Sequence, residues 1–116
     1  MATARRPFTE EEIEAAWQRA IIQSNNDPNV YRKDYAGAWI RRQDYGQQTE
    51  YGWEIDHVRP LALDGTYNPR NLMPLHWQNN LEKSDDFPLW NTKITSNGIH
   101  NVEEQKSWYV NPANYA

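Results

Sequence analysis

The spacing of apolar positions changes along the chain, and each change predicts a different element. Near the N-terminus the apolar residues recur every three or four positions, which is the spacing of one buried helix face. These residues are Ile13, Trp17, Ala20 and Ile21. Thr9 and Glu12 match a capping box, and Phe8 with Ile13 fits the hydrophobic staple around it. The pattern therefore predicts a helix over about residues 10–23.

Shorter runs of apolar residues with turn residues between them predict two hairpins. Residues 31–42 contain extended runs on both sides of Ala36-Gly37. The second hairpin is centred on Asn97-Gly98, the preferred pair for a type I′ turn. Together with the tail that follows, it covers about residues 93–116. The first seven residues and the segment from Asn111 onward are expected to be loose.

Between the two hairpins, residues 53–86 read as strand, loop, strand and helix. The first apolar run, Trp53-Glu54-Ile55, ends in the pair Asp56-His57, and a loop rich in Pro, Gly and Asn follows. A second run at residues 71–75 leads into a polar segment, His76–Lys83, of helix-compatible composition. These elements together predict a small single α+β domain covering residues 1–116.

The composition limits the class of protein. The chain has 116 residues, no cysteine, and 13% aromatic residues, which suits a small domain without disulfides. The apolar runs are too short for a membrane-spanning helix or a signal-peptide core, so no membrane partner is expected and the cytoplasm is the default location.

Four side chains at the junctions of the strand–loop–strand–helix segment suggest chemistry. Asp56 and His57 come where the first strand gives way to loop, and Asn80 and Lys83 are three residues apart in the predicted helix. Carboxylate and amide oxygens are hard ligands that suit Mg²⁺ or Mn²⁺. An imidazole can accept a proton from water near neutral pH, and an ammonium can hold a phosphate.

This arrangement resembles the HNH endonuclease family, whose ββα-metal core carries an Asp-His pair, a central Asn and a terminal His or Asn. Asp56-His57, Asn71 and Asn80 match these elements in order, and the sequence NLEKSD from Asn80 is similar to the asparagine-ending branch. Many family members also carry two Cys-x-x-Cys pairs for a structural zinc. This chain has no cysteine, so no structural zinc is expected, and His76 is a weak candidate for an additional ligand.

The resemblance implies a role for each matched residue. Asp56 and Asn80 would bind one divalent ion, preferably Mg²⁺ and otherwise Mn²⁺ or another divalent ion. His57 would activate the attacking water, and with an ordinary pKa near 6.5 it would lose this capacity below about pH 6. Asn71 would fix the loop so that His57 is oriented, and Lys83 would lie near the scissile phosphate or an adjacent one.

The expected substrate is double-stranded DNA, although the net charge of −4 is unusual for a protein that binds it. Several basic residues in the middle of the chain could form a DNA-binding face: Arg41, Arg42, Arg59, Arg70 and Lys83. A protein partner that aids DNA binding would compensate for the acidic balance.

Two alternatives remain open at this stage. The first is an HNH-like module that binds DNA or protein without cutting, and the second is a ribonuclease or toxin-type nuclease that uses the same site. The resemblance does not choose among phage packaging, homing, restriction and toxin roles.

Overall fold

The computed structural model describes residues 4–115, and it begins with the helix that the capping box predicts. In α1 (Glu10–Gln18) the Thr9 hydroxyl accepts a hydrogen bond from the Glu12 amide, and the Glu12 carboxylate accepts one from the Thr9 amide. The predicted start is confirmed. The predicted end near residue 23 is wrong, because Ile21 forms an antiparallel bridge with Lys33 and lies 49% exposed.

The first predicted hairpin is confirmed. Strands β1 (Tyr31–Lys33) and β2 (Trp39–Arg41) pair antiparallel on either side of the turn. Gly37 has φ +91°, and a Cβ at this position would lie 2.6 Å from the Thr95 hydroxyl. The turn therefore requires glycine both for its backbone conformation and for the close approach of the second hairpin.

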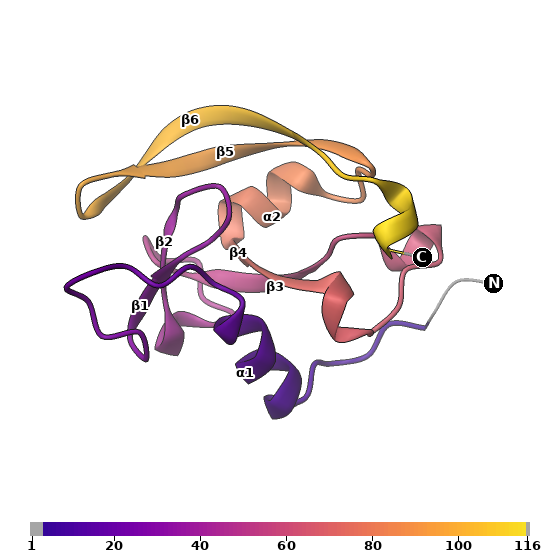
Figure 1. Ribbon diagram of the computed structural model, residues 1–116, viewed down its shortest axis with the longest axis horizontal. Coiled ribbons are helices and arrows are strands. Elements are labelled where there is room, and N and C mark those ends of the chain that lie inside the picture. Colours follow the sequence, from indigo (N-terminus) through magenta and orange to yellow (C-terminus); the bar gives the residue numbers. More distant parts are fainter. Residues whose placement is uncertain (1–3, 116) are drawn as a thin grey trace.

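The order strand, loop, strand, helix is also confirmed. Strand β3 (Trp53–His57) pairs antiparallel with β4 (Leu72–His76), and α2 (Trp77–Lys83) follows β4 directly. Together they lie between α1 and the long C-terminal hairpin, and α2 packs against both strands (Figure 1). Both strands are buried along most of their length, which is expected for a strand pair covered on both faces.

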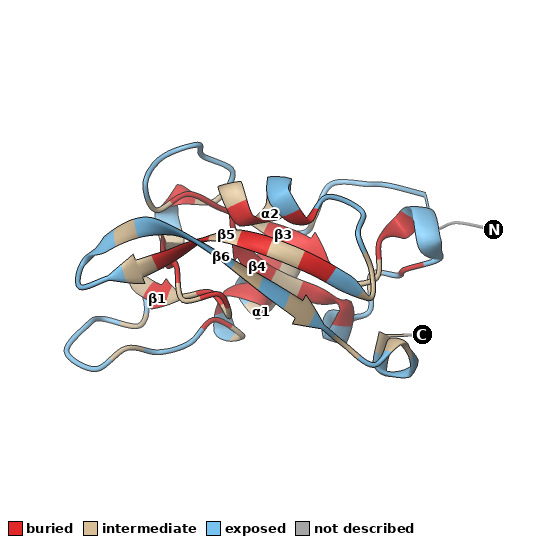
Figure 2. Cartoon of the chain, turned by 90° about the horizontal axis from the view of Figure 1, so that it is seen from above, coloured by how far each residue is buried: buried red, intermediate tan, exposed pale blue. Residues whose placement is uncertain are grey.

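The second hairpin is longer than expected and turns at a different pair of residues. Strands β5 (Leu89–Asn97) and β6 (His100–Tyr109) pair from end to end, with Asn97 opposite His100. The two turn residues are consequently Gly98 and Ile99, and only Gly98 has positive φ. Glycine at the first turn position is typical of a type II′ turn, so the predicted type I′ turn at Asn97-Gly98 is wrong by one residue. Strand β5 packs on α2 with buried residues that mostly alternate with half-buried ones, whereas β6 is mostly exposed (Figure 2).

The main apolar core lies where α1 meets β2, β3 and β4. Its buried members are Ile13, Ala16, Trp17, Ala20, Ile40, Trp53, Ile55 and Leu72. The rings of Trp17 and Trp53 pack with centroids 5.4 Å apart. Each indole N–H donates to a backbone carbonyl, of Pro28 and Arg42 respectively, so neither ring leaves a buried donor without a partner.

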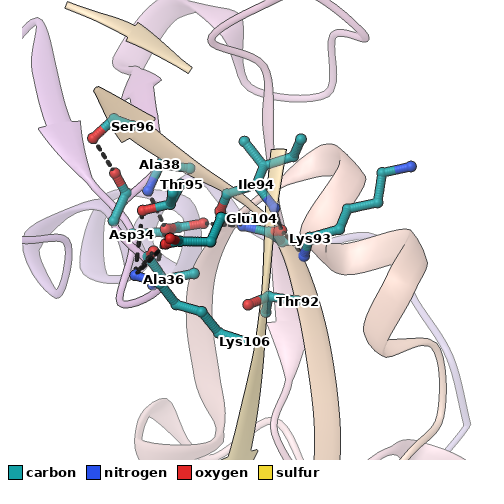
Figure 3. Close-up of polar contacts among 12 residues, drawn as sticks. Asp34, Ala36, Ala38, Thr92, Lys93, Ile94, Thr95, Ser96, Glu104 and Lys106 are labelled. Atoms are coloured by element: carbon teal, nitrogen blue, oxygen red, sulfur yellow. Dashed lines mark hydrogen bonds and ion pairs between the residues drawn. The ribbon is translucent and has the colours of Figure 1, made fainter. Parts of the chain in front are cut away.

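A buried carboxylate, Asp34, joins the first hairpin to the start of α2. One of its oxygens accepts from the amides of Ala36 and Ala38 (Figure 3). The other accepts from the His76 amide and the Asn79 side chain. Burial raises the pKa of Asp34 to about 6, although four donors oppose the rise.

Asn79 extends this network to β5. Its amide oxygen accepts from the backbone N–H groups of Lys93 and Ile94, and its amide nitrogen donates to the Ile94 carbonyl. Lys106 of β6 donates to the Ala36 carbonyl and to the Thr95 hydroxyl (Figure 3). These contacts fix both hairpins relative to α2.

The C-terminal residues are attached to the rest of the protein, contrary to the expectation of a loose tail. The 3₁₀ helix η4 (Pro112–Tyr115) is held by Arg59, whose guanidinium donates to the carbonyls of Tyr115 and Pro112 at 2.8 and 3.2 Å. No helix among the described residues is both long and apolar enough to cross a membrane.

Candidate functional site

The strand β3 ends at Asp56 and His57, and both side chains border one pocket. The pocket has a volume of about 160 Å³ and is also lined by Asn80 of α2, by Asp85 after it, and by Arg5. Asp56 and His57 are only 4% and 7% exposed. The structure thus brings together Asp56 and His57 at the end of β3 with Asn80 of α2.

Two buried atoms in this pocket lack hydrogen-bond partners within the described residues. They are the Asp56 Oδ2 and the His57 Nε2. The Asn80 side chain is half-buried and also forms no hydrogen bond there. Buried polar groups almost always form hydrogen bonds in proteins, so this convergence of ligand-type atoms without hydrogen bonds indicates a binding site, although the Asp56 Oδ2 also has the Lys83 ammonium 3.4 Å away.

Lys83 does not occupy the position that the sequence analysis assigned to it. Its side chain is fully buried, and its ammonium donates to the carbonyls of His57 and Val58 at 3.3 and 3.1 Å. The same ammonium lies 3.4 Å from the Asp56 Oδ2 and 5.0 Å from the centre of the Trp90 ring. Lys83 therefore fixes the end of β3 to α2 from inside the protein, where it is closed off from a phosphate in the pocket.

Burial changes the protonation of both members of the acid–base pair. Burial raises the pKa of Asp56, while the ammonium of Lys83 acts in the opposite direction and the charge of Asp85 adds to the rise. Burial also lowers the pKa of His57 to about 4, helped by the positive charges of Arg5 and Lys83. His57 is therefore a neutral imidazole near neutral pH, and it stays neutral well below the pH 6 limit expected from an ordinary histidine.

Asn71 closes the loop that connects β3 to β4. Its amide oxygen accepts from the Arg59 N–H at 2.7 Å, and its amide nitrogen donates to the carbonyls of Arg59 and Thr66. The side chain is buried, so all these hydrogen bonds are shielded from water. These contacts fix the backbone directly after His57, the arrangement that the expected role of Asn71 requires.

The segment before α1, expected to be frayed, lies against the pocket from Arg5 onward. The Tyr67 hydroxyl accepts from the Arg6 N–H at 2.8 Å and donates to the Arg6 carbonyl at 3.0 Å. The Arg6 guanidinium stacks over the Tyr67 ring at 3.8 Å and binds both carboxylate oxygens of Glu12. This anchoring brings Arg5 to the pocket.

The same segment encloses His57 with aromatic rings. The centroids of Phe8 and Tyr67 lie 5.3 and 4.8 Å from that of the imidazole. Sequence reasoning missed Arg5 and Tyr67 as site residues, because their contacts with the site connect parts of the chain that are far apart. The staple residue Phe8 was the available signal that the chain is already ordered before α1.

Most of the arginines predicted to contact nucleic acid are engaged within the protein. Arg41 forms an ion pair with Asp44 at 2.9 Å, and Arg42 forms one with Glu14 at 3.2 Å. Arg59 holds η4, as described above. Arg70 is exposed and lies in a different cavity from Asp56 and His57.

His76 is not available as an additional ligand, because both ring nitrogens have partners. The Nδ1 atom accepts from the Gln78 amide, and the Nε2 atom lies 2.8 Å from the Glu50 carbonyl. Across residues 4–115 no group of three or more His, Cys, Asp or Glu side chains could hold a metal ion. A metal at the Asp56 pocket would therefore depend on few protein ligands.

Comparison with known families identifies one match over the center of the chain. Residues 42–86 match the family model described as HNH endonuclease. This segment contains β3, the following loop, β4 and α2, and with them every residue that the sequence resemblance assigned to the metal site and to catalysis. No curated protein and no solved structure matches the chain.

Proposed function

Because residues 42–86 match the HNH endonuclease family, we propose that this protein is a divalent-metal-dependent endonuclease that hydrolyses phosphodiester bonds in DNA. The observation that carries the proposal is the convergence of the Asp56 carboxylate, the His57 Nε2 without a hydrogen-bond partner and the Asn80 side chain on one pocket. A carboxylate, a neutral imidazole and an amide are the groups that this reaction needs.

The donor set of the pocket fits a hard divalent cation. Asp56 supplies a carboxylate oxygen without a hydrogen-bond partner, and Asn80 can supply an amide oxygen. Mg²⁺ suits such a small set, since it commonly retains several waters and also binds substrate phosphate. When bound, the ion supplies stabilisation of the negative charge that develops on the phosphate and on the departing oxygen.

His57 is suited to act as the general base. Its Nε2 has no hydrogen-bond partner, and its lowered pKa keeps the ring neutral over the physiological range. The rings of Phe8 and Tyr67 limit its rotation. His57 would accept the proton of the attacking water, and Asn71 would hold the loop behind it.

The two cations near the site have separate roles in this proposal. Lys83 is a positioning residue, since its ammonium binds the carbonyls of His57 and Val58 and lies beside Asp56. Arg5 lines the pocket and has no ion pair within the described residues. A guanidinium in this position can bind a substrate phosphate through two parallel hydrogen bonds, the role that the sequence had suggested for Lys83.

A supercoiled-plasmid assay with Mg²⁺, Mn²⁺ or EDTA tests the proposal. We expect metal-dependent nicking that falls about 10²–10⁴-fold in His57→Ala, because this is the usual contribution of a general base. His100→Ala is the matched control, since His100 lies exposed on β6 and outside the pocket.

Three results would contradict the proposal, each in a different part. Equal cleavage by the wild type and His57→Ala would exclude His57 as the base. Absence of cleavage with every metal, combined with binding of the plasmid, would identify a binding module. Cleavage of an RNA strand but not of DNA would assign the same site to a ribonuclease.

A further inference from the structure

Because the chain has more acidic than basic residues, the few basic side chains that are not engaged within the protein are candidates for binding an anionic ligand. The chain has 12 Lys and Arg against 16 Asp and Glu. Ion pairs, side-chain hydrogen bonds or ring contacts within the protein engage Arg6, Arg32, Lys33, Arg41, Arg42, Arg59, Lys83 and Lys106. Over residues 4–115, the cations whose side chains have no such contact are Arg5, Arg19, Arg70 and Lys93.

Two of these four free cations meet in one cavity. Arg19, at the end of α1, and Arg70, in the 3₁₀ helix η3 (Pro69–Asn71), line a cavity of about 440 Å³ together with Asn114 of η4. None of the described residues that line this cavity is an Asp or a Glu. The guanidinium groups come from separate elements, so the fold places two uncompensated positive charges around one open space.

Arg19 also carries an unsatisfied donor. Its Nη1 is shielded from solvent and has no hydrogen-bond partner within the described residues. Arg19 borders a neighbouring cavity with Glu11 and Glu12, but no ion pair joins it to either, and Glu12 is bound by Arg6. A buried donor without a partner is costly, so the Arg19 guanidinium retains hydrogen-bonding capacity that no group of the described residues satisfies.

We propose that the cavity between Arg19 and Arg70 is a second phosphate-binding site, which holds a backbone phosphate of the nucleic-acid substrate away from the cleaved bond. The planar guanidinium groups match phosphate oxygens in pairs, and Asn114 offers an amide donor at the same cavity. The assignment to a nucleic-acid backbone rests on the proposed nuclease function.

The loop between β3 and β4 connects the two sites. Pro60 and Leu61, near its start, line the pocket of His57, whereas Arg70, near its end, lines the second cavity. Asn71 ties the loop together through Arg59 and Thr66. A strand that is bound at both places would therefore contact the two ends of one fixed loop.

The test measures binding in EDTA, where no cleavage occurs. Fluorescence anisotropy with a labelled DNA duplex would compare Arg19→Gln, Arg70→Gln and the double variant with Lys93→Gln. Lys93→Gln is the matched control, because it removes one free positive charge outside both cavities. If Arg19→Gln fails to fold, Arg70→Gln alone decides the test, since Arg70 is exposed.

We expect weaker binding in both single variants than in the control. In the double variant, the slope of log affinity against log salt should decrease by about 0.9, the loss of one phosphate contact. The KM for cleavage should rise while kcat changes little, because the site lies away from the reacting bond. Equal affinity and equal salt slope in the double variant and the control would overturn the second site.

A competition experiment separates the backbone phosphate from a free one. If pyrophosphate shifts the NMR signal of the Asn114 side chain in the wild type but the double variant retains full duplex affinity, the cavity binds free phosphate and the nucleic-acid assignment is wrong.

A protein that binds DNA through Arg19 and Arg70 but does not cut would support the second site and refute the nuclease. Cleavage by the wild type, combined with unchanged DNA binding in the double variant, would support the nuclease and refute the second site.

Discussion

Replacing Lys83 with methionine should destabilise the protein through the charge that it leaves behind on Asp56. Both side chains are buried, and the Lys83 Nζ and the Asp56 Oδ2 lie 3.4 Å apart. At this distance and an effective dielectric constant of about 20, their attraction is about 5 kcal/mol. Removing the cation also relieves the cost of burying it, so we expect Lys83→Met to lower the free energy of unfolding by about 3–5 kcal/mol.

A double-mutant cycle with Asp56→Asn isolates this contribution. In the Asp56→Asn background Lys83→Met leaves no unpaired charge, only the carbonyls of His57 and Val58 without their donor. The cost of the lysine substitution should then fall to about 1–3 kcal/mol. Urea unfolding followed by tryptophan fluorescence at pH 8, above the raised pKa of the Asp56 carboxyl when it is paired with Lys83, measures all four corners of the cycle.

The same cycle at pH 5 provides an internal check. Burial raises the pKa of Asp56, so the carboxyl takes up a proton at pH 5 once Lys83 is absent. The cost of Lys83→Met should accordingly be smaller at pH 5 than at pH 8. If the two substitutions are additive within about 0.5 kcal/mol at pH 8, the ion pair does not account for the stability, and the reasoning about Asp56 is refuted.

Three further predictions concern the surroundings of His57. Asn71→Ala should cost about 1–3 kcal/mol and increase amide exchange in the loop after β3, and unchanged exchange would contradict the closing role of Asn71. In metal-free protein the His57 imidazole should titrate by NMR near pH 4, and a midpoint near 6.5 would refute this. Because the folded pKa is lowered, the contribution of His57 to the free energy of unfolding is present above pH 6.5 and decreases as the pH falls toward 4. Tyr67→Phe removes both hydrogen bonds to Arg6, and it should cost about 1 kcal/mol and raise the pKa of His57, because Arg5 is released. An unchanged pKa would mean that Arg5 stays in place without Tyr67.

Features determined by neighbouring residues could be predicted from the sequence. The capping box gave the start of α1, and the apolar runs around Asp56-His57 gave the order of β3, β4 and α2. The end of α1 could not be predicted in this way. Ile21 continues the helical stripe, but its backbone pairs with Lys33, and pairing with a distant strand overrides local propensity.

The positions of charged side chains were the hardest part of the site to predict. Helical spacing correctly places Asn80 and Lys83 in α2, but it does not say that Lys83 ends beneath β3 rather than in the pocket. Arg5 reaches the pocket through the contact between Arg6 and Tyr67, which lie 61 positions apart. The pKa of His57 follows from burial that exists only in the folded chain.

The network around Asp34 bears on how this site could be transplanted into another protein. Asp34 and β5 lie outside residues 42–86, the segment that matches the family. Excising that segment would deprive the His76 amide and the Asn79 side chain of their acceptors and donors in the interior. The smallest graft that keeps these groups satisfied therefore extends from the β1–β2 hairpin through β5, and a shorter graft would carry Asp56, His57 and Asn80 without the scaffold that orients α2.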